Sequence, residues 1–283
     1  MPHDASAKPV RLTRKVSFSA GHRYWLSSKT EAENRKLFGQ WASPFNHGHN
    51  YVLAVTVEGT VEPSSGMVVN IKIIDDLLKR HVLSKFDQKS LNDEVPEFID
   101  QAPSLENLLL DIKRRITESK ELTDSVKLVH LRLDEMPTLY AELDLTKEPM
   151  LTITRSYEFA ASHRLHSPDL SPEENIRLYG KCNNPAGHGH NYLVDVTVSA
   201  PVNAETGMSV DIACLDTVVN EQVVDRYDHK NLSEDLPEFK GRVASSEIVA
   251  QEIFNRLKEN VPGKLCRVRL TETARNIFEV NAD

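Results

Sequence analysis

The chain has 283 residues, of which 40% are hydrophobic and 27% charged, with a formal net charge of −8 and no basic cluster. This length suits two ordinary domains, and the acidic balance argues against nucleic acid as a partner. No apolar run reaches the roughly 18 residues of a membrane helix, residues 1–10 do not read as a signal peptide, and three sparse cysteines suggest reduced thiols in a cytoplasmic protein.

The first half of the chain predicts the order strand, strand, helix, helix, strand, strand. Alternating apolar residues, β-rich stretches and turn residues place these elements at Arg11–Phe18, Tyr51–Thr60, Ile71–Lys85, Ser104–Glu118, Lys127–Glu135 and Pro137–Leu143. The segment 144–149 is polar and ends in a proline, which is typical of a linker. We therefore expect a first domain at 1–143.

The second half, residues 150–283, predicts the same order of elements. They lie at Leu151–Phe159, Asn191–Ser199, Ile212–Asp225, Ser245–Lys258, Arg267–Glu272 and Asn276–Val280. The expected fold class is α+β: two tandem units, each an antiparallel four-stranded sheet with two helices on one face. Because exposed sheet edges need partners, we expect the chains to form homo-oligomers.

The two halves are copies of one another. The stretch Phe18–Arg23 resembles Phe159–Arg164, and His47–Tyr51 returns as His188–Tyr192. The spacing is constant at 141 residues, as for His22 and His163 (163 − 22). Such a constant spacing over many positions indicates a tandem duplication.

Three histidines in each copy predict a metal site. In an extended chain, residues i and i+2 project from one face, so His188 and His190 can reach the same ion. His163, at the end of the preceding strand, would be the third ligand. Three imidazoles with one open position are typical of catalytic zinc. The matching residues in the first copy are His22, His47 and His49. A hydrogen-bonded histidine cluster at an oligomer seam is the alternative.

The longer motifs of the second copy resemble a known family. They are Ala160–Leu165, Leu178–Tyr192, Tyr227–Leu232 and Thr271–Thr273. Together they are similar to the 6-pyruvoyl-tetrahydropterin synthase family, which includes the 6-carboxy-tetrahydropterin synthases of queuosine biosynthesis. The resemblance covers nearly all of both copies. It implies the tunnelling fold (T-fold), active sites between subunits, and a trimer of these double-length chains that mimics the family's hexamer.

The resemblance also implies a substrate and residue roles. The substrate would be 7,8-dihydroneopterin triphosphate, which loses triphosphate with Zn²⁺ as Lewis acid and without a redox cofactor. Cys182 would be the general base, and Asp228 with His229 a proton-relay dyad. The implied pterin contacts are Ser245, Ser246, Glu247 and Glu272 in the second copy, and Glu106 and Glu135 in the first. Read singly, each residue has a plain structural alternative, such as core packing for the thiol.

The first copy departs from the family pattern at two positions. Trp41 stands where Cys182 would be expected, and Gln88 stands where His229 would be. Indole has no basic lone pair, and an amide does not titrate usefully. We expect the first copy to bind zinc without running the reaction. Whether it binds a pterin, and which neighbouring unit completes each site, stays open.

The segment around the thiol bears on the choice of reaction. His188 follows Cys182 by six positions, and this longer form is more similar to the pyruvoyl-forming branch. We expect a carbon–oxygen lyase acting on phosphates, a 6-pyruvoyl-tetrahydropterin synthase, with the carboxy-forming reaction second. A non-catalytic zinc- or pterin-binding relative, and an aldolase or epimerase acting on another pterin or purine, are the remaining alternatives.

Overall fold

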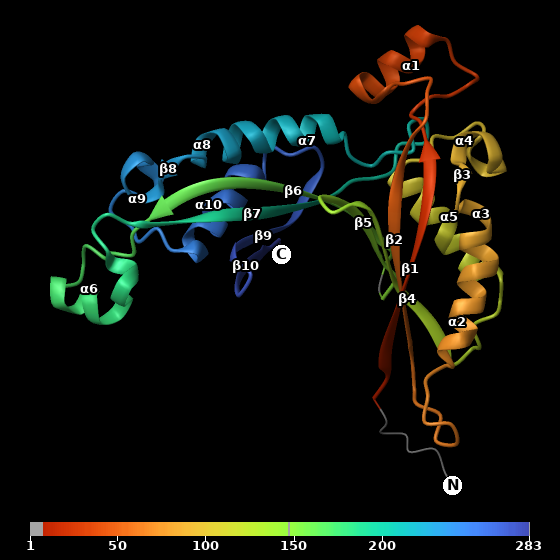
Figure 1. The fold of residues 1–283 in the computed structure, drawn as a ribbon, viewed down its shortest axis with the longest axis horizontal. Coiled ribbons are helices and arrows are strands. Elements are labelled where there is room, and N and C mark those ends of the chain that lie inside the picture. The colour runs from red at the N-terminus through yellow and green to blue at the C-terminus, as the bar shows by residue number, and fades with distance from the viewer. Residues whose placement is uncertain (1–7, 147, 283) are drawn as a thin grey trace. The chain divides into compact units, whose positions relative to one another are not determined.

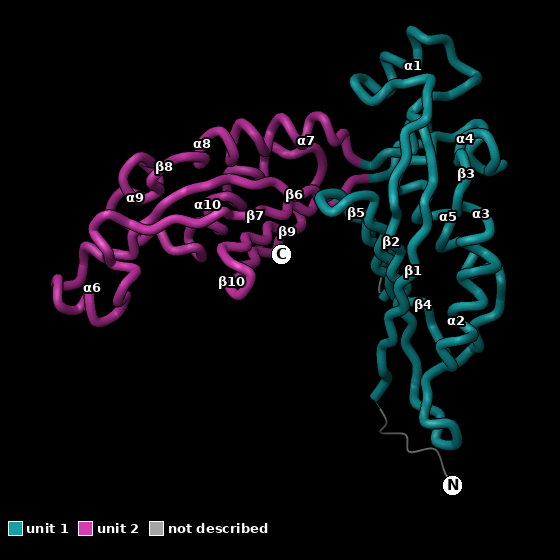
Figure 2. Tube along the Cα trace, viewed as in Figure 1, with its two compact units in different colours: residues 1–153, 201–209 teal, residues 154–200, 210–283 magenta. Residues whose placement is uncertain are grey.

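The computed structural model describes residues 8–146 and 148–282 and divides into two compact units (Figures 1 and 2). Unit 1 comprises the described residues up to 153 together with 201–209, and unit 2 comprises 154–200 and those from 210 onward. The expectation of no signal peptide rests largely on residues 1–7, and Lys147 belongs to the expected linker. Those residues lie outside the described ones.

The sheet of unit 1 is built on two long antiparallel strands, β1 (Val10–His22) and β2 (His47–Gly59). Their register places His22 opposite His47 and Ala20 opposite His49. The strands β4 (Val126–Met136) and β5 (Leu139–Asp144) extend the sheet beyond β2, and β3 (Lys89–Ser90) pairs in parallel with the end of β1.

Two long helical segments cover one face of this sheet (Figure 1). The first runs through α2 (Ile71–Leu78), a π-helical turn (Lys79–Leu83) and α3 (Ser84–Phe86), and the second is α5 (Leu105–Glu118). Their apolar side chains fill the core: Ile74, Leu77, Leu78, Val82, Phe86, Leu108, Leu109, Ile112 and Ile116 are all buried. Burying each large side chain stabilises the unit by about 1.5–3 kcal/mol.

Unit 2 repeats this arrangement with its own elements. Its sheet runs β10 (Asn276–Asn281), β9 (Lys264–Thr273), β7 (His188–Ser199) and β6 (Met150–His163), with β8 (Lys230–Asn231) beside β6. Its helices are α7 (Ile212–Val219), continued by a π-helical turn (Asn220–Val224) and α8 (Asp225–Tyr227), then α9 (Leu232–Asp235) and α10 (Ser246–Leu257). The alternating valines of β7 are fully buried, as its sequence pattern predicts.

The α+β class and the two tandem units are confirmed, but the expected sheet needs a correction. Each unit contains five described strands rather than four, and the extra strand is parallel to its neighbour. These strands, β3 and β8, are two residues long, so they carry no period that a sequence pattern could reveal.

Four short helices were also absent from the expectation. They are α1 (Glu31–Phe38), α4 (Leu91–Glu94) and, in unit 2, α6 (Pro172–Tyr179) and α9. Both α1 and α6 begin with a capping box, Thr30 with Glu33 and Ser171 with Glu174, which could have predicted them. Throughout the part of the chain that is described, every helix is too short or too polar to cross a bilayer.

Candidate metal centre and active site

The three histidines of unit 2 converge on one point. His163 ends β6, while His188 and His190 begin β7 on the same side of that strand. One ring nitrogen from each lies within 4.8 Å of the others. The rings of His163 and His188 are 4.6 Å apart between centroids, and those of His188 and His190 are 5.0 Å apart. This spacing lets one ion contact all three rings.

The hydrogen bonding of His163 fixes which nitrogen faces the cluster. Its Nδ1 lies 2.7 Å from the carbonyl oxygen of Ala244, and because a carbonyl only accepts, Nδ1 carries the proton. Nε2 is therefore left with a free lone pair. Among the described residues, His163 Nε2, His188 Nδ1 and His190 Nε2 are buried and have no hydrogen-bond partner. Three converging lone pairs without a donor fit a metal ion.

Burial also sets the protonation state of this cluster. It lowers the pKa of His163, of His188 and of His190 below the ordinary value, since a charged ring loses solvation when buried. The rings are consequently neutral near pH 7, which is the form that binds a metal.

Unit 1 holds the same arrangement in β1 and β2. The ligand atoms of His22, His47 and His49 lie within 4.8 Å of one another. His22 Nδ1 donates to the carbonyl of Pro103 at 3.0 Å, again leaving Nε2 to face the cluster. Burial lowers the pKa of His22 to about 3 and that of His49 to about 4. Both units thus offer a neutral three-imidazole site.

A carboxylate borders each histidine cluster. Glu272 Oε1 lies 3.8 Å from His190 Nε2, and Glu135 Oε1 lies 3.6 Å from His49 Nε2. Burial alone would raise the pKa of Glu272, but hydrogen bonds from Asn276 and Ser246 outweigh it and hold this pKa below the ordinary value. Glu272 is therefore an ionised acceptor beside the cluster.

A cavity of about 740 Å³ opens beside the histidines of unit 2. It brings together eight residues that the sequence singled out: His163, Cys182, His188, His190, Ser245, Ser246, Glu247 and Glu272. Cys182 comes from the 3₁₀ turn Gly180–Asn183 that follows α6, and Glu247 is an exposed residue in the first turn of α10. The volume is in the range of small-molecule sites.

Sequence reasoning missed two cations of this cavity, Lys181 and Arg275. Lys181 directly precedes Cys182, and Arg275 lies in the turn between β9 and β10. The position of Lys181 next to the thiol was a signal that could have been used. Lysine and arginine in a cavity are the side chains that bind phosphate groups.

The Asp228–His229 dyad lies elsewhere in unit 2. Neither residue is among the described residues that line the cavity with Cys182. His229 instead borders a second cavity of about 660 Å³, next to His190 and Asn191. The structure therefore does not bring the dyad and Cys182 into one cavity of this unit.

The dyad is nevertheless held in a defined geometry. His229 Nδ1 lies 2.7 Å from Asp228 Oδ2, and the imidazole is 84% exposed. Asp228 accepts from the backbone N–H of Ala160, which is the first cause of its lowered pKa, while the N–H of His229 donates to the Ala160 carbonyl. His229 adopts a φ of 57°, a left-handed conformation that is rare for residues other than glycine and is concentrated at functional sites.

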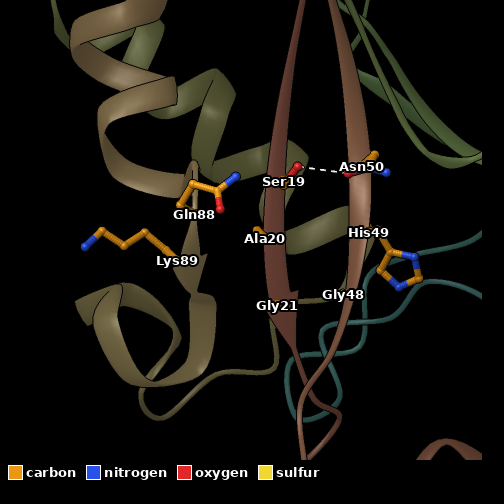
Figure 3. A pocket seen from close by; sticks show the side chains of 8 residues that line it. All are labelled: Ser19, Ala20, Gly21, Gly48, His49, Asn50, Gln88 and Lys89. Carbon is orange, nitrogen blue, oxygen red and sulfur yellow. Dashed lines mark hydrogen bonds between the residues drawn. The ribbon is translucent and has the colours of Figure 1, made fainter.

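Unit 1 keeps this backbone without the imidazole (Figure 3). Gln88 has a φ of 58°, and its N–H donates to the carbonyl of Ser19 at 2.7 Å. Asp87 accepts from the Ser19 N–H, and Ser19 donates to Asn50 at 2.8 Å. The cavity lined here by Gln88 and Lys89 measures about 330 Å³. Unit 1 thus has the same left-handed backbone conformation at Gln88 but no titratable side chain there.

The remaining residues predicted for unit 1 are less accessible than their counterparts. Glu106, in the first turn of α5, is only 4% exposed and accepts two hydrogen bonds from Ser209. Glu135 is also buried. Trp41 ends the 3₁₀ turn Gly39–Trp41, in the place that Cys182 has in unit 2.

Comparison with known proteins gives the same result for both halves. The family described as 6-pyruvoyl tetrahydropterin synthase matches residues 11–145 and again 152–283. The 6-pyruvoyl tetrahydrobiopterin synthase of Homo sapiens is 46% identical over 126 residues, which cover 44% of this chain and 87% of that protein. The Drosophila melanogaster protein of the same name is 41% identical over 136 residues, covering 47% and 81%.

The chain is also similar to a protein named for the carboxy product and to a solved structure. The 6-carboxy-5,6,7,8-tetrahydropterin synthase of Rickettsia conorii is 24% identical over 149 residues, covering 47% of this chain and 99% of that protein. The solved structure of Caenorhabditis elegans 6-pyruvoyl tetrahydropterin synthase shares 41% identity and covers 48% of this chain and 97% of its own, with a TM-score of 0.46. Each of these relatives corresponds to about half of this chain.

Proposed function

Because the chain belongs to the 6-pyruvoyl tetrahydropterin synthase family, we propose that it is a zinc-dependent 6-pyruvoyl-tetrahydropterin synthase acting on 7,8-dihydroneopterin triphosphate in unit 2. One observation carries the proposal: a single cavity joins three converging imidazoles, a thiol and two carboxylates. The relatives named for the pyruvoyl product are also far more similar than the one named for the carboxy product, at 46% against 24% identity.

The three imidazoles are the proposed zinc ligands. Neutral histidine nitrogens suit Zn²⁺, and the open side of the cluster faces the cavity. A zinc ion bound there would act as a Lewis acid toward the hydroxyl groups of the substrate side chain. The carbonyl of Ala244 holds the His163 ring in the orientation that this ligation requires.

The carboxylates would orient the pterin ring. Its guanidine-like edge presents N–H donors side by side, and an ionised carboxylate accepts such a pair. Glu247 is exposed in the cavity, and the carboxylate of Glu272 is ionised and fixed by Ser246 and Asn276. The ring would then lie with its side chain toward the histidines.

Cys182 would take the proton from the substrate carbon next to those hydroxyls. A thiolate is the reactive form of cysteine, and Cys182 lines the same cavity as the three histidines. Because His229 lines a different cavity of its own unit and neither Asp228 nor His229 lines the Cys182 cavity there, we propose that the dyad serves the Cys182 cavity of a second copy of the chain. Lys181 and Arg275 would bind the triphosphate that leaves.

The assembly and location complete the proposal. Three chains would supply the six units of a hexamer, and we place this trimer in the cytoplasm. Light scattering should then report three times the chain mass of 31.9 kDa.

Product analysis tests the reaction. Purified zinc-loaded protein should release triphosphate from 7,8-dihydroneopterin triphosphate and yield the pyruvoyl product by mass spectrometry, and a chelator should abolish both. A carboxy product with acetaldehyde would move the chain to the queuosine branch. No triphosphate release at full zinc loading would indicate a non-catalytic pterin-binding relative.

A further inference from the structure

Unit 1 contains a nine-residue segment whose sequence belongs to the second copy. Residues 201–209 group with unit 1 rather than with the unit that precedes and follows them in the chain (Figure 2). The segment forms a turn in which the N–H of Asn203 donates to the Met208 carbonyl at 2.9 Å. Lys29 forms an ion pair with Glu205 at 2.7 Å. The turn therefore packs with unit 1, although its sequence belongs to the second copy.

The end of the turn binds Glu106, one of the two carboxylates that the family resemblance assigns to the pterin in the first copy. Glu106 Oε1 accepts from the backbone N–H of Ser209 at 2.6 Å and from its hydroxyl at 2.8 Å. Ser104 Oγ donates to the Gly207 carbonyl at 2.6 Å. Both donors converge on one oxygen of this buried carboxylate, so they occupy an acceptor that a pterin N–H would otherwise use.

Glycine is required at the point of closest approach. Gly207 has a φ of 71°, and a Cβ there would lie 2.0 Å from Asn107 Nδ2. The equivalent turn of the first copy has the same backbone at Gly66, with a φ of 68°, yet a Cβ there would meet no described atom within 4 Å. The two glycines differ in packing and not in conformation.

Apolar side chains fill the space beside the histidines of unit 1. Met208 packs against a buried cluster of Leu26, Phe38 and Ala102, with Tyr24 at its border. The Tyr24 ring lies 5.4 Å from the ring of His22. In unit 2 the residue matching Tyr24 is Leu165, which lines the open cavity.

The matching groups of the other turn and helix are free of this packing. Met67, the counterpart of Met208, is 43% exposed. Glu247, the counterpart of Glu106, is exposed at the wall of the 740 Å³ cavity. The turn of the second copy is thus packed against the helix of the first copy, whereas Met67 and Glu247 at the two matching positions are exposed.

We propose that residues 201–209 permanently occupy the pterin-binding position of unit 1, so that each chain has two metal sites but one pterin site. This inference rests on the proposed function of unit 2. A pterin could reach Glu106 only by displacing a segment of the same chain, which competes at a high effective concentration. The donors of Ser209 stand in for those of the ligand, and Tyr24 and Met208 take up its volume.

Binding stoichiometry tests the proposal with a pterin that cannot react. Zinc-loaded full-length protein is dialysed to equilibrium against neopterin, which carries no triphosphate, and compared with the matched variants Glu106→Gln and Glu247→Gln. We expect one neopterin per chain for the wild type and for Glu106→Gln, and at least tenfold weaker binding for Glu247→Gln. Two neopterins per chain, or a site lost with Glu106→Gln, would overturn the inference. No binding by the wild type would overturn the proposed function and this inference with it.

A second experiment addresses the turn directly and does not depend on a ligand. Gly207→Ala should force the turn away from α5 and raise the rate of cleavage after Glu205 by a glutamate-specific protease at least tenfold. Gly66→Ala is the matched control, because it imposes the same backbone strain without the clash, and it should leave that rate unchanged. Equal cleavage of the two variants would show that the turn does not occupy the site.

Discussion

Nε2 of His163 and Oε1 of Glu272 lie 3.7 Å apart in the interior of unit 2, too far for a hydrogen bond. The histidine is held by the Ala244 carbonyl and the carboxylate by Ser246, so each side chain is fixed by a partner outside the cluster. Within the described residues, the Nε2 atom keeps no partner. Two rigid acceptors that face one another in this way are an arrangement that a cation stabilises, because it removes their repulsion.

We predict two zinc ions per chain that can be removed one at a time. His188→Ala and His47→Ala should each lower the zinc content from two to one, measured by atomic emission after dialysis. Only His188→Ala should abolish turnover, because only unit 2 has the thiol beside its metal site. Zinc at a hundredfold excess over Kd should raise the free energy of unfolding by about 2.7 kcal/mol for each site, or about 5 kcal/mol for both. A wild-type chain that gains no metal would contradict this prediction.

Cys182→Ala should lower kcat by about 10²–10⁴-fold, which is the usual contribution of a general base. Zinc content and neopterin affinity should be unchanged, since the thiol is not among the proposed ligands. Cys214→Ala is the control: this exposed residue lies on α7, away from the described lining of the cavity, and its loss should not affect kcat. Turnover of Cys182→Ala near the wild-type rate would show that another group acts as the base.

The apo-protein should lose stability as the pH falls from about 6.5 toward 4. Burial lowers the pKa of His22 from 6.5 to about 3, so in this window the unfolded chain binds a proton that the folded chain does not. Stability therefore rises with pH across it, by up to a few kcal/mol for such a shift. Denaturant titrations of the chelated protein should show this slope, and it should flatten in His22→Gln. His130 lies outside the cluster, so a comparable flattening in His130→Gln would mean that the pH dependence of stability comes from general charge effects.

The sequence predicts the parts of the site that depend on local geometry. The alternation of side chains in β7 places His188 and His190 on one face without knowledge of the fold. The constant spacing of the repeat predicts the same arrangement for the matching histidines of unit 1. The parts of the site that the sequence could not predict depend on packing between distant segments. The adjacency of Asp228 and His229 does not reveal that His229 opens into another cavity, and the hydrogen bond from Ser209 to Glu106 joins residues 103 positions apart.

Arg275→Ala should weaken binding of the triphosphate substrate without weakening binding of the pterin ring. If the guanidinium binds the leaving triphosphate, its loss should raise KM for 7,8-dihydroneopterin triphosphate about tenfold, equivalent to about 1.4 kcal/mol. The affinity for neopterin, which has no phosphate, should be unchanged. Arg242→Ala, outside the described lining of the cavity, is the control. An equal loss for both ligands would mean that Arg275 shapes the turn between β9 and β10 instead.

His229→Gln should lower turnover because an amide does not titrate usefully. It should leave the fold intact, because unit 1 already carries glutamine in this left-handed conformation at Gln88. We expect a fall in kcat of about 10²–10⁴-fold with zinc content unchanged. If the dyad serves the Cys182 cavity of another copy of the chain, mixing and reassembling His229→Gln with Cys182→Ala should restore activity. Random exchange would give intact sites at roughly a quarter of positions, since each site then draws one residue from either chain. Mixtures that stay as inactive as their components would show that cysteine and dyad come from the same chain.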